Sequence, residues 1–318
     1  NLFVGWSERT RGEVAMVLAT RVVTAGSGVV FVLLTARHLG PIGRGEITVA
    51  FTIAYVTANF SSLGTTTSGP IRLLAPNDPV GTNDVWSLTV ALVPLQAALA
   101  TGAVYVLSQV ALHLEARFML SVVGLSVATM VFRGAVSMLY GLRRYRTVMV
   151  GETGLAVVQV VAVVLLFRSA RLTSTSAVLV MAVGMFACAG WLVGQPGVLG
   201  RGGGRPVWTH WKSLIRDGIS PMVGGVLFFS AMRIDRLILA MFVGTESVGV
   251  YTVALAIPET LRILPMAIGQ VIAARGRSGI DTLATVKRNG LLALTGHLVV
   301  LVLSAAVGWI FLPLAFGE

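Results

Sequence analysis

Ionisable side chains interrupt several long apolar runs of this sequence, and these are the residues whose types and spacing could do chemistry. They comprise five arginines and three carboxylates: Arg21, Arg133, Arg233, Arg236 and Arg262, with Glu152, Asp235 and Glu259. An ionisable group at the centre of a bilayer costs about 2.5–3.5 kcal/mol on insertion scales, so each one is a candidate functional residue. The excess of arginines predicts a cavity that favours anions, because a guanidinium group binds phosphate oxygens through a planar fork of donors.

The arginines, which we interpret as candidates for substrate binding, also have structural interpretations. Arg21 lies about two helical turns into its apolar run, near the limit from which its side chain could reach the lipid headgroups. Arg133 is placed similarly in its own run. Arg233 and Arg236 are three residues apart and therefore share one face of a helix.

The carboxylates are candidates for ion coupling or for structural ion pairs. Asp235 points away from the arginine that follows it by about 100° and could pair with an arginine of a neighbouring helix. Glu259 and Arg262 are three residues apart and could pair along their own helix, which contains prolines on both sides of them. Glu152 lies near the start of its apolar run. For Asp235 and Glu259 the ion pair is the more conservative interpretation.

No set of residues typical of an enzyme can be recognised. The sequence has one cysteine and no H-E-x-x-H motif, and it shows neither a Ser-His-Asp pattern nor paired carboxylates. The glycine-rich stretch at 202–204 lacks the strand and the Lys-Ser/Thr ending of a phosphate-binding loop. We therefore expect a protein that is not an enzyme and that needs no cofactor and no metal ion.

The composition indicates that the chain is surrounded mostly by membrane lipid. Hydrophobic residues make up 55% of the 318 residues and charged residues only 12%, whereas a soluble domain carries about 25% charged residues. The net charge of +11 could suggest a nucleic-acid partner, but the basic residues are scattered singly between apolar runs. This distribution argues against nucleic acid and is typical of arginines in the loops of a membrane protein.

Nine apolar runs are long enough to cross a bilayer, which takes about 20 residues. They are 14–36, 47–71, 86–109, 117–139, 148–167, 175–195, 218–242, 248–273 and 290–314. No run alternates with the period of two that a membrane β-barrel requires. The sequence therefore predicts an all-α integral membrane protein with about nine transmembrane helices.

The longest break between these runs divides the chain into two parts. We predict an N-lobe of six helices at 1–196, a basic cytoplasmic linker at 197–217, and an incomplete C-lobe of three helices at 218–318. Loop arginines and lysines are more numerous on the side of the N-terminus, while the other side carries Arg37, Arg44, Arg117, Arg168 and Arg171. The excess predicts a cytoplasmic N-terminus in a multi-pass protein of the cytoplasmic membrane.

A stretch of the N-lobe is repeated in the C-lobe. The residues HLGPIGRGEITVAFTIA at 38–54 align with FVGTESVGVYTVALAIP at 242–258, and the matching positions are a constant 204 residues apart. A glycine-containing turn between two membrane helices could produce a short match of this kind. The match continues for a full helical turn, however, and six predicted spans separate its copies. This predicts a parallel repeat, as in transporters whose two lobes enclose the substrate.

The same stretches resemble a known family. ARHLGPIGRGEITVAFTIA at 36–54, SSLGTTTSGPIRLLA at 61–75 and RIDRLILAMFVGTESVGVYTVALAIPE at 233–259 are similar to the polysaccharide transporter family. These are the Wzx-type flippases of the MATE/oligosaccharidyl-lipid/polysaccharide superfamily. The resemblance implies a MATE-like fold that moves an undecaprenyl-pyrophosphate oligosaccharide across the cytoplasmic membrane by alternating access. It also implies a role in polysaccharide or lipopolysaccharide synthesis, beside polymerase or glycosyltransferase partners.

The number of spans departs from the family, whose members have twelve or more. We expect the natural gene to encode at least three further spans, and we expect these 318 residues alone not to transport.

Two related functions are alternatives: a flippase for lipid II, the peptidoglycan precursor, and a multidrug or cation antiporter. The antiporter would need a cavity rich in carboxylates. A membrane-bound enzyme would need a catalytic set of residues, and a purely structural protein would not explain the repeat and the arginines within the spans.

Overall fold

The chain folds into a helical bundle. The computed structural model describes residues 8–75, 77–110, 115–200 and 207–261, together with Leu291, Thr295, Leu298 and Val302. Within these residues there is no strand, so the prediction of an all-α fold is confirmed for this part of the chain. Its helices are α1 (Glu8–Ser61), α2 (Thr65–Leu74), α3 (Thr82–Ala91), α4 (Val93–Val110), α5 (Ala116–Gly141), α6 (Tyr145–Arg168), α7 (Ser174–Val193), α8 (Trp208–Phe242) and α9 (Thr245–Leu261).

Helix α1 contains two of the predicted spans. Its helical geometry is broken at Gly40, where φ is 68° and ψ is −176°, and Pro41 follows. Glycine tolerates this positive φ, and proline suits the first turn of the helix that follows. The chain therefore turns back here, as the sequence predicted, and we call residues 8–39 the first limb and 41–61 the second limb of α1.

Two other predicted spans are interrupted. The span predicted at 47–71 breaks after Ser61, because Leu63 and Gly64 have φ values of 46° and 75°, and the chain resumes as α2. The span predicted at 86–109 begins earlier, at Thr82, and breaks at Leu92, shortly before a proline that cannot continue a regular helix. α8 begins at Trp208, within the predicted linker.

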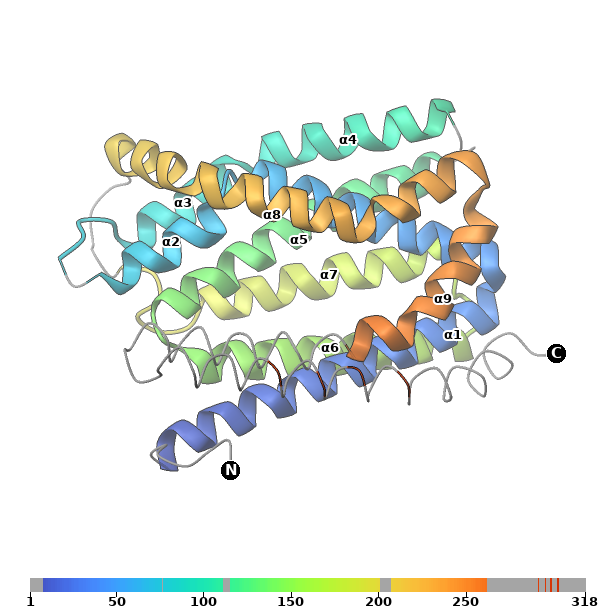
Figure 1. Cartoon of the computed structure of the whole chain (residues 1–318), viewed down its shortest axis with the longest axis horizontal. Coiled ribbons are helices and arrows are strands. Elements are labelled where there is room, and N and C mark those ends of the chain that lie inside the picture. Colours follow the sequence, from blue (N-terminus) through green and yellow to red (C-terminus); the bar gives the residue numbers. More distant parts are fainter. Residues whose placement is uncertain are drawn as a thin grey trace.

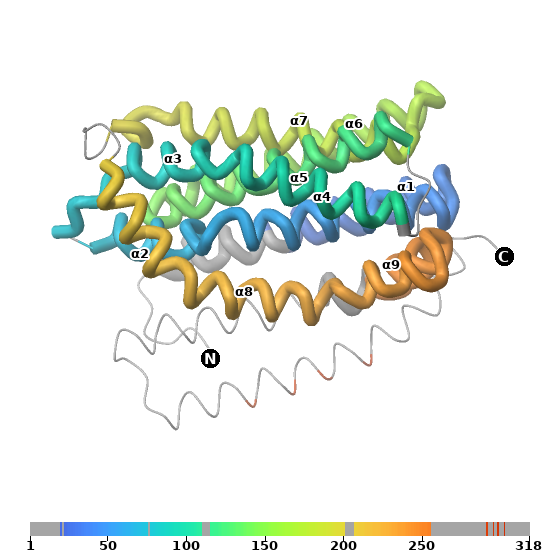
Figure 2. Tube along the Cα trace, turned by 90° about the horizontal axis from the view of Figure 1, so that it is seen from above, coloured from blue at the N-terminus to red at the C-terminus, as the bar shows by residue number. Residues whose placement is uncertain are grey.

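The long helices lie side by side and run alternately in opposite directions (Figures 1 and 2). One end of the bundle, the kink end, holds Gly40, the turn between α6 and α7, and the turn between α8 and α9. At this end the Ser174 hydroxyl donates to the carbonyl oxygen of Gly43. The opposite end, the α2 end, holds α2, the turn between α5 and α6, and the start of α8.

Two clusters of buried apolar side chains form the core. One lies toward the kink end and includes Ile47 and Leu125, while the other lies toward the α2 end and includes Met138, Leu139 and Leu214. Leu214 belongs to α8 and is fully buried. The first part of α8 is therefore packed on the N-lobe (α1–α7) and is not a free connection between two lobes.

Five helical stretches of the described residues are long and apolar enough to cross a membrane. They are Val22–Ser61, Thr82–Gln109, Ala116–Gly141, Tyr145–Arg168 and Ser174–Val193. Large apolar side chains also cover the outside of α6, where Val150, Val158 and Leu165 are exposed. An apolar surface of this kind suits lipid, so these helices indicate a multi-pass membrane protein. The predicted run at 290–314 lies outside the described residues except for four of them.

The sequence repeat is accompanied by a repeated local structure. Gly244, which is 204 residues after Gly40, also has a positive φ, of 104°. The hydroxyls of Thr48 and Thr252, which are equivalent in the repeat, each donate to the carbonyl oxygen four residues earlier, at 3.0 and 2.6 Å. Each copy thus consists of a glycine turn followed by a helix with the same side-chain hydrogen bond.

Candidate functional site: an arginine-lined cavity

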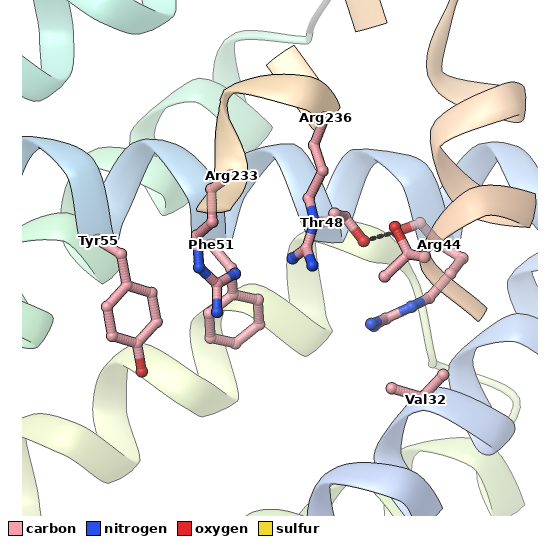
Figure 3. Close-up of a pocket in the computed structure, with 8 residues that line it drawn as sticks. Val32, Arg44, Thr48, Phe51, Tyr55, Arg233 and Arg236 are labelled. Carbon is pink, nitrogen blue, oxygen red and sulfur yellow. Dashed lines mark hydrogen bonds between the residues drawn. The ribbon is translucent and has the colours of Figure 1, made fainter. Parts of the chain in front are cut away.

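A cavity of about 170 Å³ lies where both limbs of α1 meet α8 and α9 (Figure 3). It is lined by Val32, Arg44, Thr48, Phe51, Tyr55, Arg233, Arg236 and Thr252. Two pairs of these residues, Val32 with Arg236 and Thr48 with Thr252, are 204 residues apart in the sequence. The cavity therefore lies between equivalent elements of the two copies of the repeat, and we call it the arginine cavity.

Glycines allow the second limb of α1 and α9, which carry the two copies of the repeat, to approach each other closely beside this cavity. A Cβ atom on Gly45 would collide with the carbonyl oxygen of Thr245, and one on Gly249 would collide with that of Pro41. Gly249 is the equivalent of Gly45, and Thr245 is the equivalent of Pro41, so the contact is reciprocal, as at the interface of a symmetric dimer. We call these four residues the glycine crossing. It lies one helical turn from Thr48 and Thr252, on the side of the kink end.

Three guanidinium groups face the arginine cavity. Arg44 and Arg236 are only 6% and 2% exposed, and Figure 3 shows that Arg233 comes from the same side as Arg236. The sequence prediction that Arg233 and Arg236 share a face is therefore confirmed. No carboxylate lines this cavity among the described residues.

Aromatic rings hold two of these arginines in place. Arg233 Cζ lies 5.3 Å from the centroid of the Tyr55 ring, and Arg44 Cζ lies 5.7 Å from that of Phe31. Arg44 Nη1 also donates to the hydroxyl of Thr35 at 3.4 Å. A ring face attracts a cation. With three guanidinium groups, the described lining offers several N–H donors, which suit an anion with oxygen acceptors.

Asp235 is held by hydrogen bonds from α8 and α9. Its carboxylate accepts a hydrogen bond from the Tyr251 hydroxyl at 2.6 Å and another from the backbone N–H of Arg236 at 2.9 Å. Tyr251 belongs to α9, so Asp235 ties α9 to α8. No arginine side chain of the described residues pairs with it, and the predicted ion pair could form only with an arginine whose side chain is outside the described residues.

Arg133 and Glu152 do not line the arginine cavity. Arg133 lies on α5 with its Cζ 5.6 Å from the centroid of the Phe229 ring on α8, and its buried Nη1 has no hydrogen-bond partner within the described part of the chain. Glu152 lines a second cavity, described below. Arg21 and Glu259 lie on α1 and α9, but their side chains are outside the described residues, as is the whole of Arg262.

Sequence reasoning missed Arg44, which it counted as a loop residue. The turn at Gly40 is so tight that Arg44 already belongs to the first turns of the second limb, where it is buried. One signal could have identified it. Arg44 lies one helical turn before Thr48, a repeat-matched position, and between two glycines, which are residues that let another helix approach closely.

A polar seam joins α8 to α2 and α3 at the α2 end. The Asp84 carboxylate lies 2.9 Å from His210 Nδ1 and also accepts from the backbone N–H of Val207 at 3.0 Å. Arg72 Nη2 lies 2.6 Å from Asp217 Oδ2, and the guanidinium group holds the pKa of that carboxyl below its usual range. We call the Asp84–His210 contact, the Arg72–Asp217 ion pair and their neighbours the α2–α8 seam.

The described residues contain no group of three or more His, Cys, Asp or Glu side chains that could hold a metal ion. Comparison with models of protein families, with curated proteins and with solved structures finds no match for this chain.

Proposed function

We propose that this chain is part of a flippase that moves an undecaprenyl-pyrophosphate oligosaccharide across the cytoplasmic membrane for the synthesis of cell-surface polysaccharide. The observation that carries the proposal is the arginine cavity, in which three guanidinium groups, one from α1 and two from α8, face a space that no carboxylate of the described residues lines. A pyrophosphate offers several anionic oxygens, which match the planar forks of arginine.

The size of the cavity supports a site for the charged group of the substrate. Sites that enclose a drug-sized molecule have volumes of about 300–1,000 Å³, and the arginine cavity has about 170 Å³. It could hold a pyrophosphate but not a whole oligosaccharide. In our proposal the lipid tail stays in the bilayer, and the sugars follow the pyrophosphate when the lobes move apart.

The described lining of the arginine cavity holds three arginines and no carboxylate, which favours this function over a cation antiporter. A cationic drug in a dry site needs an opposite charge, because an unpaired buried charge is strongly destabilised. Arg44 and Arg236 are almost completely buried at this site. They would repel a cationic drug and attract an anionic headgroup.

Binding to the purified chain in lipid nanodiscs tests the proposal. Undecaprenyl pyrophosphate should bind, whereas undecaprenol, which has the same tail without phosphate, should not. A hydrogen bond to a charged group contributes about 1.5–3 kcal/mol, so Arg44→Gln and Arg236→Gln should each weaken binding about tenfold or more. Arg143→Gln is the matched control, since Arg143 is exposed at the α2 end. Equal affinity in all variants would contradict the proposal.

The proposed orientation places the α2 end in the cytoplasm, because Arg72, Arg143, Arg144 and Arg146 gather there. A Tyr145→Cys variant in a Cys188→Ser background should resist a membrane-impermeant thiol reagent in intact cells and react after lysis. An Arg171→Cys variant at the kink end should react in intact cells. Labelling of position 145 from outside would reverse the orientation.

A further inference from the structure

A second cavity, of about 270 Å³, adjoins the arginine cavity inside the N-lobe. Both limbs of α1 contribute to its lining, together with α5, α6 and α7. Phe51 and Tyr55 line both cavities, and their rings project from the second limb of α1 to the same side (Figure 3). The two spaces therefore share a wall, and we call the second one the aromatic cavity.

Aromatic rings from three segments line this space. Phe31 belongs to the first limb of α1, Phe51 and Tyr55 to the second limb, and Phe132 to α5. The centroids of the Phe31 and Phe51 rings are 6.3 Å apart in an edge-to-face arrangement, and the Phe51 and Tyr55 rings stack at 6.5 Å. Sites for small organic ligands typically combine rings of this kind with a few polar groups that fix the orientation of the ligand.

The polar groups among these rings can both donate and accept hydrogen bonds. One N–H of the Gln159 amide donates to the carbonyl oxygen of Met181 at 3.4 Å, and the same amide has a second N–H and a carbonyl oxygen. The Tyr55 hydroxyl is also both a donor and an acceptor. The Ser27 hydroxyl donates to a backbone carbonyl oxygen of its own helix at 2.8 Å, and its oxygen can still accept.

This mixture distinguishes the aromatic cavity from the arginine cavity. Guanidinium groups only donate, which suits ionised phosphate oxygens that only accept. A sugar hydroxyl both donates and accepts, and the apolar C–H faces of a sugar ring can pack against aromatic side chains. Thr24 and Glu152 also line the aromatic cavity but take part in other interactions, so we assign no ligand contact to them.

We infer that the aromatic cavity binds the first sugar of the lipid-linked oligosaccharide, through Gln159, Tyr55 and the surrounding rings, while the pyrophosphate occupies the arginine cavity. This assignment rests on the proposed function. The first sugar is bonded to the pyrophosphate through one oxygen atom, so it must occupy a space that adjoins the arginine cavity. The volume of about 270 Å³ is below the range of about 300–1,000 Å³ for drug-sized ligands, so it suits one sugar unit and not the whole chain.

Lipids that differ only in the sugar test this assignment with the purified chain in nanodiscs. The probes are undecaprenyl pyrophosphate and the same lipid carrying one glucose or one N-acetylglucosamine. A sugar should raise the affinity of wild type at least about fivefold. Gln159→Leu and Tyr55→Phe should each reduce this sugar-dependent gain several-fold, because each removes groups that can hydrogen-bond a sugar hydroxyl.

Gln195→Leu is the matched control for the change at Gln159. The Gln195 amide also donates to a backbone carbonyl oxygen, that of Trp191 at 3.2 Å, and Gln195 lines neither cavity. The ratio of the affinities for the sugar-bearing and the sugar-free lipid should therefore be the same in Gln195→Leu and in wild type.

Filling the aromatic cavity gives an independent test. Gly28 lines it, and nothing lies within 4 Å of a Cβ atom added there, so a leucine side chain has room and should occupy part of the cavity. Gly28→Leu should reduce the sugar-dependent gain. Gly26→Leu on the same helix should not, because a Cβ atom there also meets nothing within 4 Å and Gly26 does not line the cavity. If the cavity held part of the lipid tail instead, Gly28→Leu would weaken all three lipids alike, which would overturn the assignment.

The remaining outcomes separate this assignment from the proposed function. Equal affinity of wild type for the sugar-free and both sugar-bearing lipids would refute the sugar site and leave the proposed function intact. A sugar-dependent gain that neither Gln159→Leu nor Gly28→Leu reduces would place the sugar elsewhere and refute the site too. Binding of none of the three lipids would refute the proposed function itself. Size-exclusion profiles identify variants that fail to fold, and two variants on different helices keep the test decisive if one of them does.

Discussion

The N-lobe meets α8 and α9 at two glycine contacts that have very different surroundings. At the glycine crossing, Gly45 and Gly249 bring the second limb of α1 against α9, and the contact is made by backbone atoms on both sides. At the α2 end, Gly64 and Gly218 also bring backbones together, but the ion pairs of the α2–α8 seam surround them.

The comparison shows two ways of holding helices together. At the glycine crossing the close approach of the two helices depends on steric fit, because backbone atoms are in contact on both sides. A backbone atom cannot move aside as the end of a flexible side chain can. The α2–α8 seam has several polar connections, including the Ser68 hydroxyl, which donates to the carbonyl oxygen of Leu214 at 2.8 Å. Polar pairs near water can exchange partners with solvent at modest cost. If the lobes move apart as we propose, we expect the seam to open more readily than the crossing.

The largest effect is expected from filling the glycine crossing. In Gly249→Ala the new methyl group would overlap the carbonyl oxygen of Pro41, so α9 must move away from α1. Overpacking of this kind costs about 3 kcal/mol, and the thermal stability of the purified protein should fall accordingly. Gly102→Ala on α4 is the control, because nothing lies within 4 Å of a Cβ added there. Equal losses in both variants would show that the crossing does not depend on shape.

A smaller effect is expected at the buried part of the seam. Asp84 is 6% exposed, and its carboxylate accepts hydrogen bonds from the backbone N–H groups of Gly81 and Val207. Asp84→Asn keeps the shape but turns one acceptor into a donor, so the backbone N–H of either Gly81 or Val207 loses its partner. This should cost about 2 kcal/mol in thermal unfolding.

Glu246→Gln is a useful comparison for that variant, because Glu246 is an exposed carboxylate in the first turn of α9. Its loss should cost less than 1 kcal/mol, through the helix dipole alone. If Asp84→Asn were as mild as Glu246→Gln, the seam would be held by its glycines and not by its polar groups.

The smallest effect is expected for the exposed ion pair between Arg72 and Asp217. The pKa of Asp217 is lowered mainly by its hydrogen bond with Arg72, so its stabilisation is present above the pKa of the unfolded state, near 3.9, and is lost as the pH falls through the lower folded value. The Asp217 side chain is 37% exposed, and such a pair contributes less than about 1 kcal/mol.

Melting temperatures between pH 3 and pH 7 should therefore differ between wild type and Asp217→Asn by a constant amount above about pH 5, and the difference should shrink as the pH falls toward pH 3. Exchanging the two charges gives a second test of the pair. The double variant Arg72→Asp with Asp217→Arg should recover the stability that either single change removes. Curves that diverge as the pH falls would contradict the assigned direction of the pKa shift.

Much of the fold follows from local properties of the sequence. Apolar runs predict the long helices, and glycine followed by proline predicts the turn at Gly40. The broken spans are harder to predict, because hydropathy is summed over about 20 residues and does not register a turn as short as Ser62–Gly64. α8 begins early because Leu214 is buried in the core of the N-lobe, and that contact joins residues that are far apart in the sequence.

The candidate site could be predicted only in part. The shared face of Arg233 and Arg236 follows from their spacing, and the offset of 204 residues indicated which elements would meet. The burial of Arg44 and the hydrogen bond from Tyr251 to Asp235 depend on how α8 and α9 pack against α1 and each other. The position of Arg44 between two glycines and one turn before Thr48 hints at its burial, but no spacing along the chain encodes the hydrogen bond from Tyr251 to Asp235.

The charged segment of α8 has a consequence for how the protein is made. Arg233, Asp235 and Arg236 follow one another closely, and α8 is not among the five stretches apolar enough to cross a membrane by composition. Each arginine adds about 2.5–3.5 kcal/mol to the insertion of an isolated helix centred on it. Because domains fold N-terminal first during synthesis, α1 is already in the bilayer when α8 leaves the ribosome. The ring of Tyr55 is then available to receive Arg233, so the N-lobe acts as the template on which this charged helix enters the membrane.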